Sequence, residues 1–166
     1  MLTVDGGICA KIGQFNIEAK QAMHYQHTQQ VPDKVKLAAA AAGLALGLTP
    51  SGFLARLAIT GLLGATAYQF RSLTVEVDDE EIRLQFGDGP IKQSFLLTDL
   101  TAVKATKINP WQGLGIHWLG NGWIYNIYGL DAVEVSFSNG KRALIGTDEP
   151  EKLASAIDGR LIVVHP

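Results

Sequence analysis

The sequence predicts a mainly β fold of the α+β class: a transmembrane helical hairpin followed by a seven-stranded antiparallel β-barrel that a C-terminal helix closes. Three observations predict it. Residues 35–70 form an almost unbroken apolar block, which is typical of membrane helices. From Leu73 onward, apolar and polar residues alternate with the period of two that is typical of strands. Near the end, Leu153, Ala154 and Ile157 form the apolar stripe of an amphipathic helix.

Residues 1–34 are polar, and we expect a cytoplasmic leader without a core of its own. Met23 is a candidate for the true start, in which case residues 1–22 are a mis-assigned extension. His24 and His27 have a spacing that could bind a metal on a helix. No cysteine or carboxylate stands at a matching spacing, so solvated loop histidines are the favoured interpretation.

The apolar block divides into stretches of 14 residues (35–48) and 18 residues (53–70), both short of the roughly 20 apolar residues that a spanning helix needs. Positive residues beside it predict a two-pass hairpin in the bacterial inner (cytoplasmic) membrane, with both ends and the barrel in the cytoplasm. The alternative is a pair of buried helices in a soluble helical core. The absence of charged or amide side chains at 37–48 disfavours it. The charged residues at the membrane flanks are Lys34, Lys36, Arg56 and Arg71.

Composition excludes several functional classes. The chain has a single cysteine, Cys9, so neither an internal disulfide nor a multi-cysteine metal site can form. Residues 71–166 carry nine Lys/Arg against thirteen Asp/Glu, a net charge near −4. An acidic domain exerts no long-range attraction on nucleic acid, so we expect no nucleic-acid partner.

The strand prediction rests on alternating segments separated by turn residues. Asp-Asp-Glu, Gly-Asp-Gly-Pro, Gly-Asn-Gly and Ser-Asn-Gly stand at the breaks between segments, and the Asn-Gly pairs favour tight hairpins. Thr147 or Asp148 can cap the final helix, which ends at Gly159. The alternating segments, from which about seven barrel strands are expected, are 73–77, 82–86, 91–97, 100–108, 116–119, 123–128, 132–137 and 142–145.

Several short motifs resemble the bacterial pleckstrin-homology-like domain proteins, which are small membrane proteins that pair a transmembrane hairpin with such a barrel. The resemblance spans residues 25–157 and implies a pleckstrin-homology-like fold for 71–166. Phosphoinositide-binding members place several Lys/Arg between the first two strands, where this chain has Asp78-Asp79-Glu80-Glu81, so we expect no binding of that headgroup. The segments that carry the resemblance are Gly113-Leu114-Gly115-Ile116, Gly122-Trp123-Ile124-Tyr125-Asn126, Ala132-Val133-Glu134-Val135 and Ile145-Gly146-Thr147-Asp148-Glu149-Pro150.

An aromatic segment is the candidate interaction surface. Strand alternation places Trp123, Tyr125 and Ile127 on one face and Ile124, Asn126 and Tyr128 on the other. We expect one face to be core, whereas the other could dock a peptide strand or lie among lipid headgroups. Ordinary barrel packing is the alternative for each residue. The candidate residues are Trp111, His117, Trp118, Trp123, Tyr125 and Tyr128.

No pattern in the sequence indicates catalysis. His117 with Asp131 or Glu134 could form a general acid/base set, but their spacing does not bring them together and no activated nucleophile is present. The glycines at 113–115 open a strand and lack a following Lys-Ser or Lys-Thr, so turn formation explains them better than phosphate binding. We therefore expect no catalytic, cofactor-binding or metal-binding residues.

These observations favour a non-catalytic interaction or scaffold module held at the membrane by its hairpin. Its expected partners are the lipid bilayer and either an unidentified protein or a second copy of the chain. The alternative function is an enzyme, or an enzyme's accessory subunit, that acts on a membrane-proximal substrate.

Overall fold

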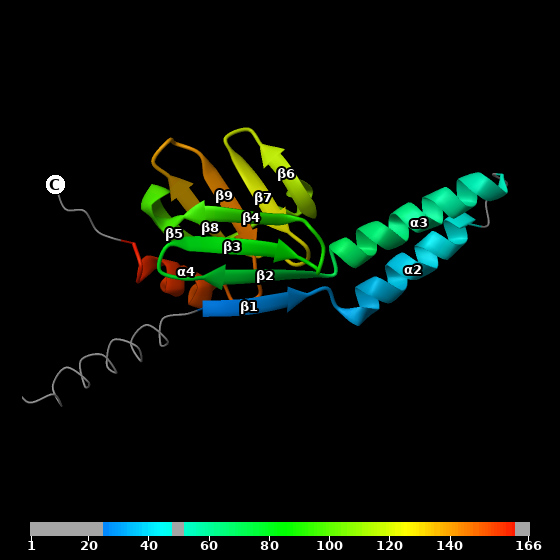
Figure 1. Ribbon diagram of the computed structural model, residues 1–166, viewed down its shortest axis with the longest axis horizontal. Helices are drawn as coiled ribbons and strands as arrows, with labels where there is room; N and C mark the ends of the chain where they lie inside the picture. Colours follow the sequence, from blue (N-terminus) through cyan, green and yellow to red (C-terminus); the bar gives the residue numbers. More distant parts are fainter. Residues whose placement is uncertain (1–24, 48–51, 162–166) are drawn as a thin grey trace, which may run out of the picture.

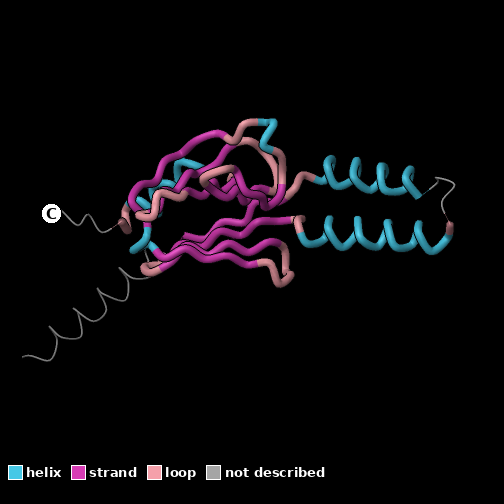
Figure 2. The backbone as a smooth tube through the Cα atoms, turned by 90° about the horizontal axis from the view of Figure 1, so that it is seen from above, coloured by secondary structure: helices cyan, strands magenta, loops and turns pink. Residues whose placement is uncertain are grey.

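The structure is a computed structural model that describes residues 25–47 and 52–161. It confirms a mainly β, α+β fold: a four-stranded and a five-stranded sheet carry most of the chain, and a pair of helices projects from one end (Figure 1). Figure 2 shows the same arrangement from a second direction. Cys9, Met23 and His24 lie outside the described residues, so the interpretations placed on them are not addressed.

The four-stranded sheet is antiparallel, in the order β1-β2-β3-β4. Its two central strands alternate strictly between buried and half-buried residues, because one face packs on the core. Residues of β1 belong to the segment that the sequence assigns to a leader, yet they pair with β2 along their whole length. The strands are β1 (Tyr25–Gln30), β2 (Ser72–Val77), β3 (Glu81–Phe86) and β4 (Lys92–Leu96).

The five-stranded sheet has the order β5-β8-β9-β7-β6, and its β7–β9 pair is parallel. The predicted seven-stranded antiparallel barrel is therefore wrong: the described residues form nine strands in two sheets, and one pair is parallel. Local alternation locates strands but does not determine which strands become neighbours. The strands are β5 (Leu100–Lys107), β6 (Gly115–Leu119), β7 (Gly122–Asn126), β8 (Asp131–Phe137) and β9 (Arg142–Gly146).

The main core lies between the sheets and under the C-terminal helix α4 (Pro150–Asp158). Leu153 and Ile157 of α4 are fully buried in it, as the predicted apolar stripe requires. Two short 3-10 turns, η1 (Leu97–Asp99) and η2 (Pro110–Gln112), flank β5. The sheets contribute mainly aliphatic residues: Leu73, Val75, Val77, Ile82, Leu84, Val133, Val135 and Ile145.

The apolar block forms a helical hairpin, α2 (Asp33–Gly47) and α3 (Phe53–Gln69), whose helices run side by side (Figures 1 and 2). Within residues 25–47 and 52–161, however, no helix is both long enough and apolar enough to cross a membrane. At 1.5 Å per residue the two helices extend about 22 and 26 Å, whereas the hydrocarbon core is roughly 30 Å thick. The predicted transmembrane hairpin, and with it the two-pass placement in the inner membrane with a cytoplasmic barrel, is wrong.

Two of the residues predicted to flank a membrane form ion pairs near the ends of the hairpin. Lys36 Nζ lies 3.0 Å from Asp33 Oδ1. Arg71 forms an ion pair with Asp88, and its guanidinium lies 4.3 Å from the centre of the Tyr68 ring. Lys34 is exposed and Arg56 is half-buried. Nearby carboxylates therefore offset part of the positive charge that the sequence shows beside the apolar block.

Candidate interaction groove

A groove with a volume of about 720 Å³ opens between β4 of one sheet and strands β6, β7 and β9 of the other. It exists because the sheets do not close on each other: within the described residues, β4 pairs only with β3 and β6 pairs only with β7. Side chains from both sheets therefore form one concave surface. Its floor is mainly apolar and consists of Phe86, Phe95, Ile116, Tyr125, Phe137 and Ala143.

Three aromatic rings fix the shape of this floor. The ring centre of Phe95 lies 5.7 Å from that of Tyr125, at an interplanar angle of 69°, and 5.4 Å from that of Phe137. Such tilted contacts between aromatic rings are favourable. Tyr125 is buried, and burial raises the pKa of its hydroxyl above the ordinary value. The floor of the groove is therefore an apolar surface of packed aromatic rings.

The rim of the groove is basic, although the domain as a whole is acidic. Lys92, Lys141 and Arg142 line it, with Asp99 as the single carboxylate. Arg142 donates hydrogen bonds to Asn121 (2.9 Å) and to Glu134 (3.3 Å). Neither lysine forms an ion pair within the described part of the chain. Net charge alone did not reveal the two lysines of this rim, because Lys92 and Lys141 come from segments that are distant in sequence.

The structure brings together only part of the predicted aromatic set. Trp123 lines the groove and is 43% exposed, and Tyr125 belongs to the floor. Trp118 stands opposite Trp123 on β6, with ring centres 5.5 Å apart in an edge-to-face contact. His117, on the same strand, is half-buried, and its Nε2 atom has no hydrogen-bond partner in the described structure. Trp118 therefore adjoins the groove wall, whereas His117 stands opposite Ile124 in the register and lies on the other face of the sheet.

Trp111 and Tyr128 lie elsewhere. Trp111 is 95% exposed on η2, and Tyr128 lies in the loop between β7 and β8. These two segments are adjacent, because the Ile108 N–H donates to the Leu130 carbonyl at 2.6 Å. The Gln29 side chain of β1 donates to the Tyr128 carbonyl at 3.0 Å. The predicted surface is therefore divided between the groove and a separate loop cluster.

The expected division of β7 into one core face and one functional face does not occur. Tyr125 and Ile127 pack in the main core, while Ile124 is buried in a second cluster on the opposite side. Ile108, just after β5, Ala132 of β8 and Leu144 of β9 complete that second cluster. Alternation along β7 did not show it, because the residues that cover Ile124 come from other segments of the chain.

The proposed acid/base partners of His117 are engaged with other side chains. Glu134 forms ion pairs with Lys104 (3.1 Å) and Arg142 (3.3 Å), and Asp131 with Lys107 (3.5 Å). His27 instead lies beside the start of α4, with Nε2 2.6 Å from Asp148 Oδ1. Among the described residues, no group of three potential ligands could hold a metal ion.

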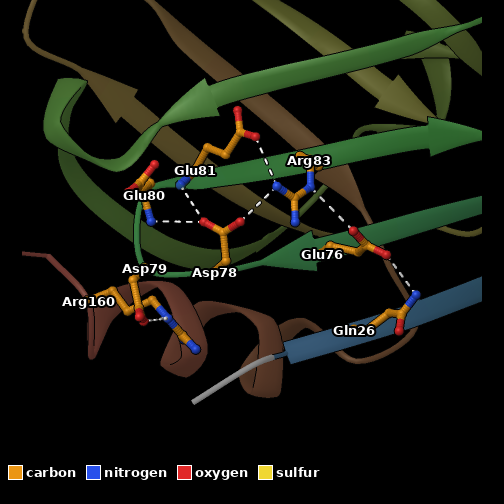
Figure 3. Close-up of polar contacts among 8 residues, drawn as sticks. All are labelled: Gln26, Glu76, Asp78, Asp79, Glu80, Glu81, Arg83 and Arg160. Carbon is orange, nitrogen blue, oxygen red and sulfur yellow. Dashed lines mark hydrogen bonds and ion pairs between the residues drawn. The ribbon is translucent and has the colours of Figure 1, made fainter. Parts of the chain in front are cut away.

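The acidic turn between β2 and β3 is held by a network of hydrogen bonds and ion pairs (Figure 3). The Asp78 carboxylate accepts from the Glu80 and Glu81 N–H groups, both at 2.8 Å, and pairs with Arg83 at 2.8 Å. Partial burial acts to raise the pKa of Asp78, but these N–H groups and the guanidinium outweigh it and hold that pKa below its ordinary value. The turn is therefore built around one arginine that is already paired.

Arg83 also pairs with Glu76 (3.3 Å) and Glu81 (3.0 Å), and Arg160 lies 3.7 Å from Asp79. A phosphorylated headgroup is bound by cations whose hydrogen-bond donors are not already engaged. In this turn Arg83 and Arg160 pair with carboxylates of the chain itself. The expectation that this turn does not bind a headgroup stays a prediction, with a structural reason added to it.

Comparison with known proteins gives no family assignment. No family model matches the chain, and no curated protein matches it. The resemblance to pleckstrin-homology-like domains therefore stays a prediction.

Proposed function

We propose that this chain is a non-catalytic interaction module of the pleckstrin-homology-like type that receives a partner protein in the groove between its sheets. One observation carries the proposal: an aromatic floor, a basic rim and two unpaired sheet edges meet at one concave surface. Aromatic residues are enriched at the cores of protein–protein interfaces, and unpaired sheet edges can bind an extended peptide. The alternative of an enzyme or accessory subunit has less support, because Asp131 and Glu134 are engaged by cations away from His117.

Site-specific photocrosslinking in cells tests the groove. A benzophenone amino acid replaces Gln93, which lines the groove, or Ser155, which is exposed on α4. We expect a discrete protein adduct from position 93 and none from position 155. Trp123→Ala should remove the adduct because it deletes part of the groove wall, whereas Trp111→Ala, on η2 outside the groove, should retain it. Adducts of equal yield at both positions, or an adduct insensitive to Trp123→Ala, would contradict the proposal.

For the hairpin we propose a lipid surface as the partner, contacted without being crossed. Apolar side chains are exposed along both helices, and they occur at positions that cover every side of α3. A second copy or one protein face would cover a single side, whereas lipid chains can surround the hairpin. The most exposed of these side chains are Leu37, Phe53, Leu54, Leu57 and Leu62.

Vesicle flotation of the full chain tests this contact. We expect flotation with pure phosphatidylcholine vesicles, and no gain on adding a phosphoinositide, because Arg83 is already paired. Replacing Leu57 and Leu62 by Asp should abolish flotation by placing charges on the hairpin. The matched control replaces Gln85 and Gln93, on the sheet, by Asp and should float normally. A chain that floats only with the phosphoinositide would contradict both expectations.

A further inference from the structure

We infer that the groove accepts one extended segment of the partner protein, which adds as a fifth strand to β4 and carries an apolar side chain flanked by carboxylates. The inference rests on the proposed function and specifies its ligand. Three features of the molecule support it: the hydrogen-bonding register of β4, the apolar floor of the groove and the charge of its rim.

The register of β4 leaves alternate backbone groups directed away from the sheet. The Phe86 N–H donates to the Ile91 carbonyl (3.1 Å), and the Leu97 N–H donates to the Glu80 carbonyl (2.9 Å). In an antiparallel pair, hydrogen-bonded positions alternate with positions whose N–H and C=O point the other way. Positions 91, 93, 95 and 97 therefore face β3. Lys92, Ser94 and Leu96 direct their N–H and C=O groups to the outer edge.

This outer edge can bind an added strand. Among residues 25–47 and 52–161, the Ser94 carbonyl has only a local partner, the Gln93 side chain at 3.0 Å, which an incoming N–H can replace. All five residues of β4 line the groove, whereas β6 contributes only Ile116. A segment paired with β4 therefore lies over the floor, which an edge contact with β6 would not achieve. Unpaired edges bind extended peptides in this way.

The floor and the rim specify the side chains of the segment. Alternate side chains of an added strand point to one face, so an apolar one can lie on Phe95, Tyr125 and Phe137. Lys92 and Lys141 on the rim favour carboxylates beside it. A second copy of this chain fits poorly as the occupant, because symmetric pairing of two β4 strands would bring two basic rims together.

Selection from a displayed library of random peptides tests the ligand class. The peptides are roughly eight residues long, which is within the usual length of a strand. The target is the full chain. We expect enriched peptides with an apolar residue flanked by Asp or Glu. For these peptides, Lys141→Glu should weaken binding on the order of tenfold, by replacing attraction with repulsion. Enrichment of basic peptides, or no enrichment, would overturn the inference.

Ser94→Pro tests strand addition itself. Proline removes the Ser94 N–H, which points away from β3, so the ladder within the sheet stays intact. We expect binding of an enriched peptide to weaken on the order of tenfold, the cost of a lost hydrogen bond and its distorted neighbours. Ser94→Ala keeps the N–H and should bind normally. If Ser94→Pro fails to fold, N-methylation of alternate peptide amides provides the same test on the peptide.

The outcomes separate the inference from the function on which it rests. If an enriched peptide competes with the adduct at position 93 but is indifferent to Ser94→Pro and to N-methylation, strand addition is overturned and the groove remains an interaction site. If position 93 gives no groove-dependent adduct, the proposed function fails whatever the library yields.

Discussion

Phe86→Ala is expected to lower the free energy of unfolding by about 3–5 kcal/mol, the usual cost of removing a buried phenyl ring. Phe86 is fully buried, and its ring centre lies 5.5 Å from Phe70, just after α3, and 6.5 Å from Tyr125 in the other sheet. The Gln69 side chain donates to the Phe86 carbonyl at 2.6 Å. One residue thus connects the hairpin base, the core and the groove floor, so its loss should loosen all three.

Urea unfolding of the full chain, followed by circular dichroism, measures this effect. Leu114→Ala is the matched control: Leu114 is 60% exposed, so a change within about 0.5 kcal/mol is expected there. If Phe86→Ala cost no more than Leu114→Ala, the core described around β3 and β7 would be incorrect.

The sequence predicts the strands from β2 to β9 well because each has apolar alternation or a turn signal at its ends. It does not reveal β1, because Tyr-Gln-His-Thr-Gln-Gln contains no apolar alternation. Contacts distant in sequence stabilise β1: Gln29 bonds the Tyr128 carbonyl, and His27 approaches Asp148. Such contacts depend on the finished fold. A domain boundary drawn at residue 71 therefore omits an edge strand.

Strand pairing places a positively charged residue beside the acidic turn, which the order of residues alone does not show. Residues 78–81 appear as a simple cluster of negative charge, but in the β2–β3 hairpin Glu76 stands opposite Arg83. Cross-strand neighbours of opposite charge stabilise such pairs. The alternation of 73–77 and 82–86, together with the short turn between them, restricts this register, so the pairing of Arg83 was predictable in principle.

The groove was not predictable in the same way. Trp123 and Tyr125 were identified as candidates, but the groove also needs Phe95 from β4 and Phe137 from β8. Their convergence depends on the parallel pairing of β7 with β9, which no local turn signal encodes. Likewise, the apolar block indicated helices, whereas the lengths that α2 and α3 reach decided against a span.

Gly122→Ala is expected to cost about 1–3 kcal/mol, because an added methyl group would overlap its neighbour across the parallel pair. A Cβ at Gly122 would lie 2.4 Å from the Arg142 carbonyl oxygen and 2.6 Å from Arg142 Cγ. The backbone oxygen cannot move aside without shifting β9. Since Gly122 stands opposite Arg142 in the register, the strain falls where β7 and β9 meet the groove.

Thermal and urea unfolding of the full chain measure the loss, and quenching of tryptophan fluorescence by acrylamide reports on the wall that Trp123 forms. Gly61→Ala is the matched control, because a Cβ there meets nothing within 4 Å and alanine favours the interior of α3. We expect Gly122→Ala to lower the midpoints of thermal and urea unfolding and to raise the quenching of tryptophan fluorescence. Gly61→Ala should leave the quenching unchanged and should leave the midpoints unchanged or raise them. Equal stability of the two variants would mean that β7 and β9 are not in the close parallel contact that shapes the groove.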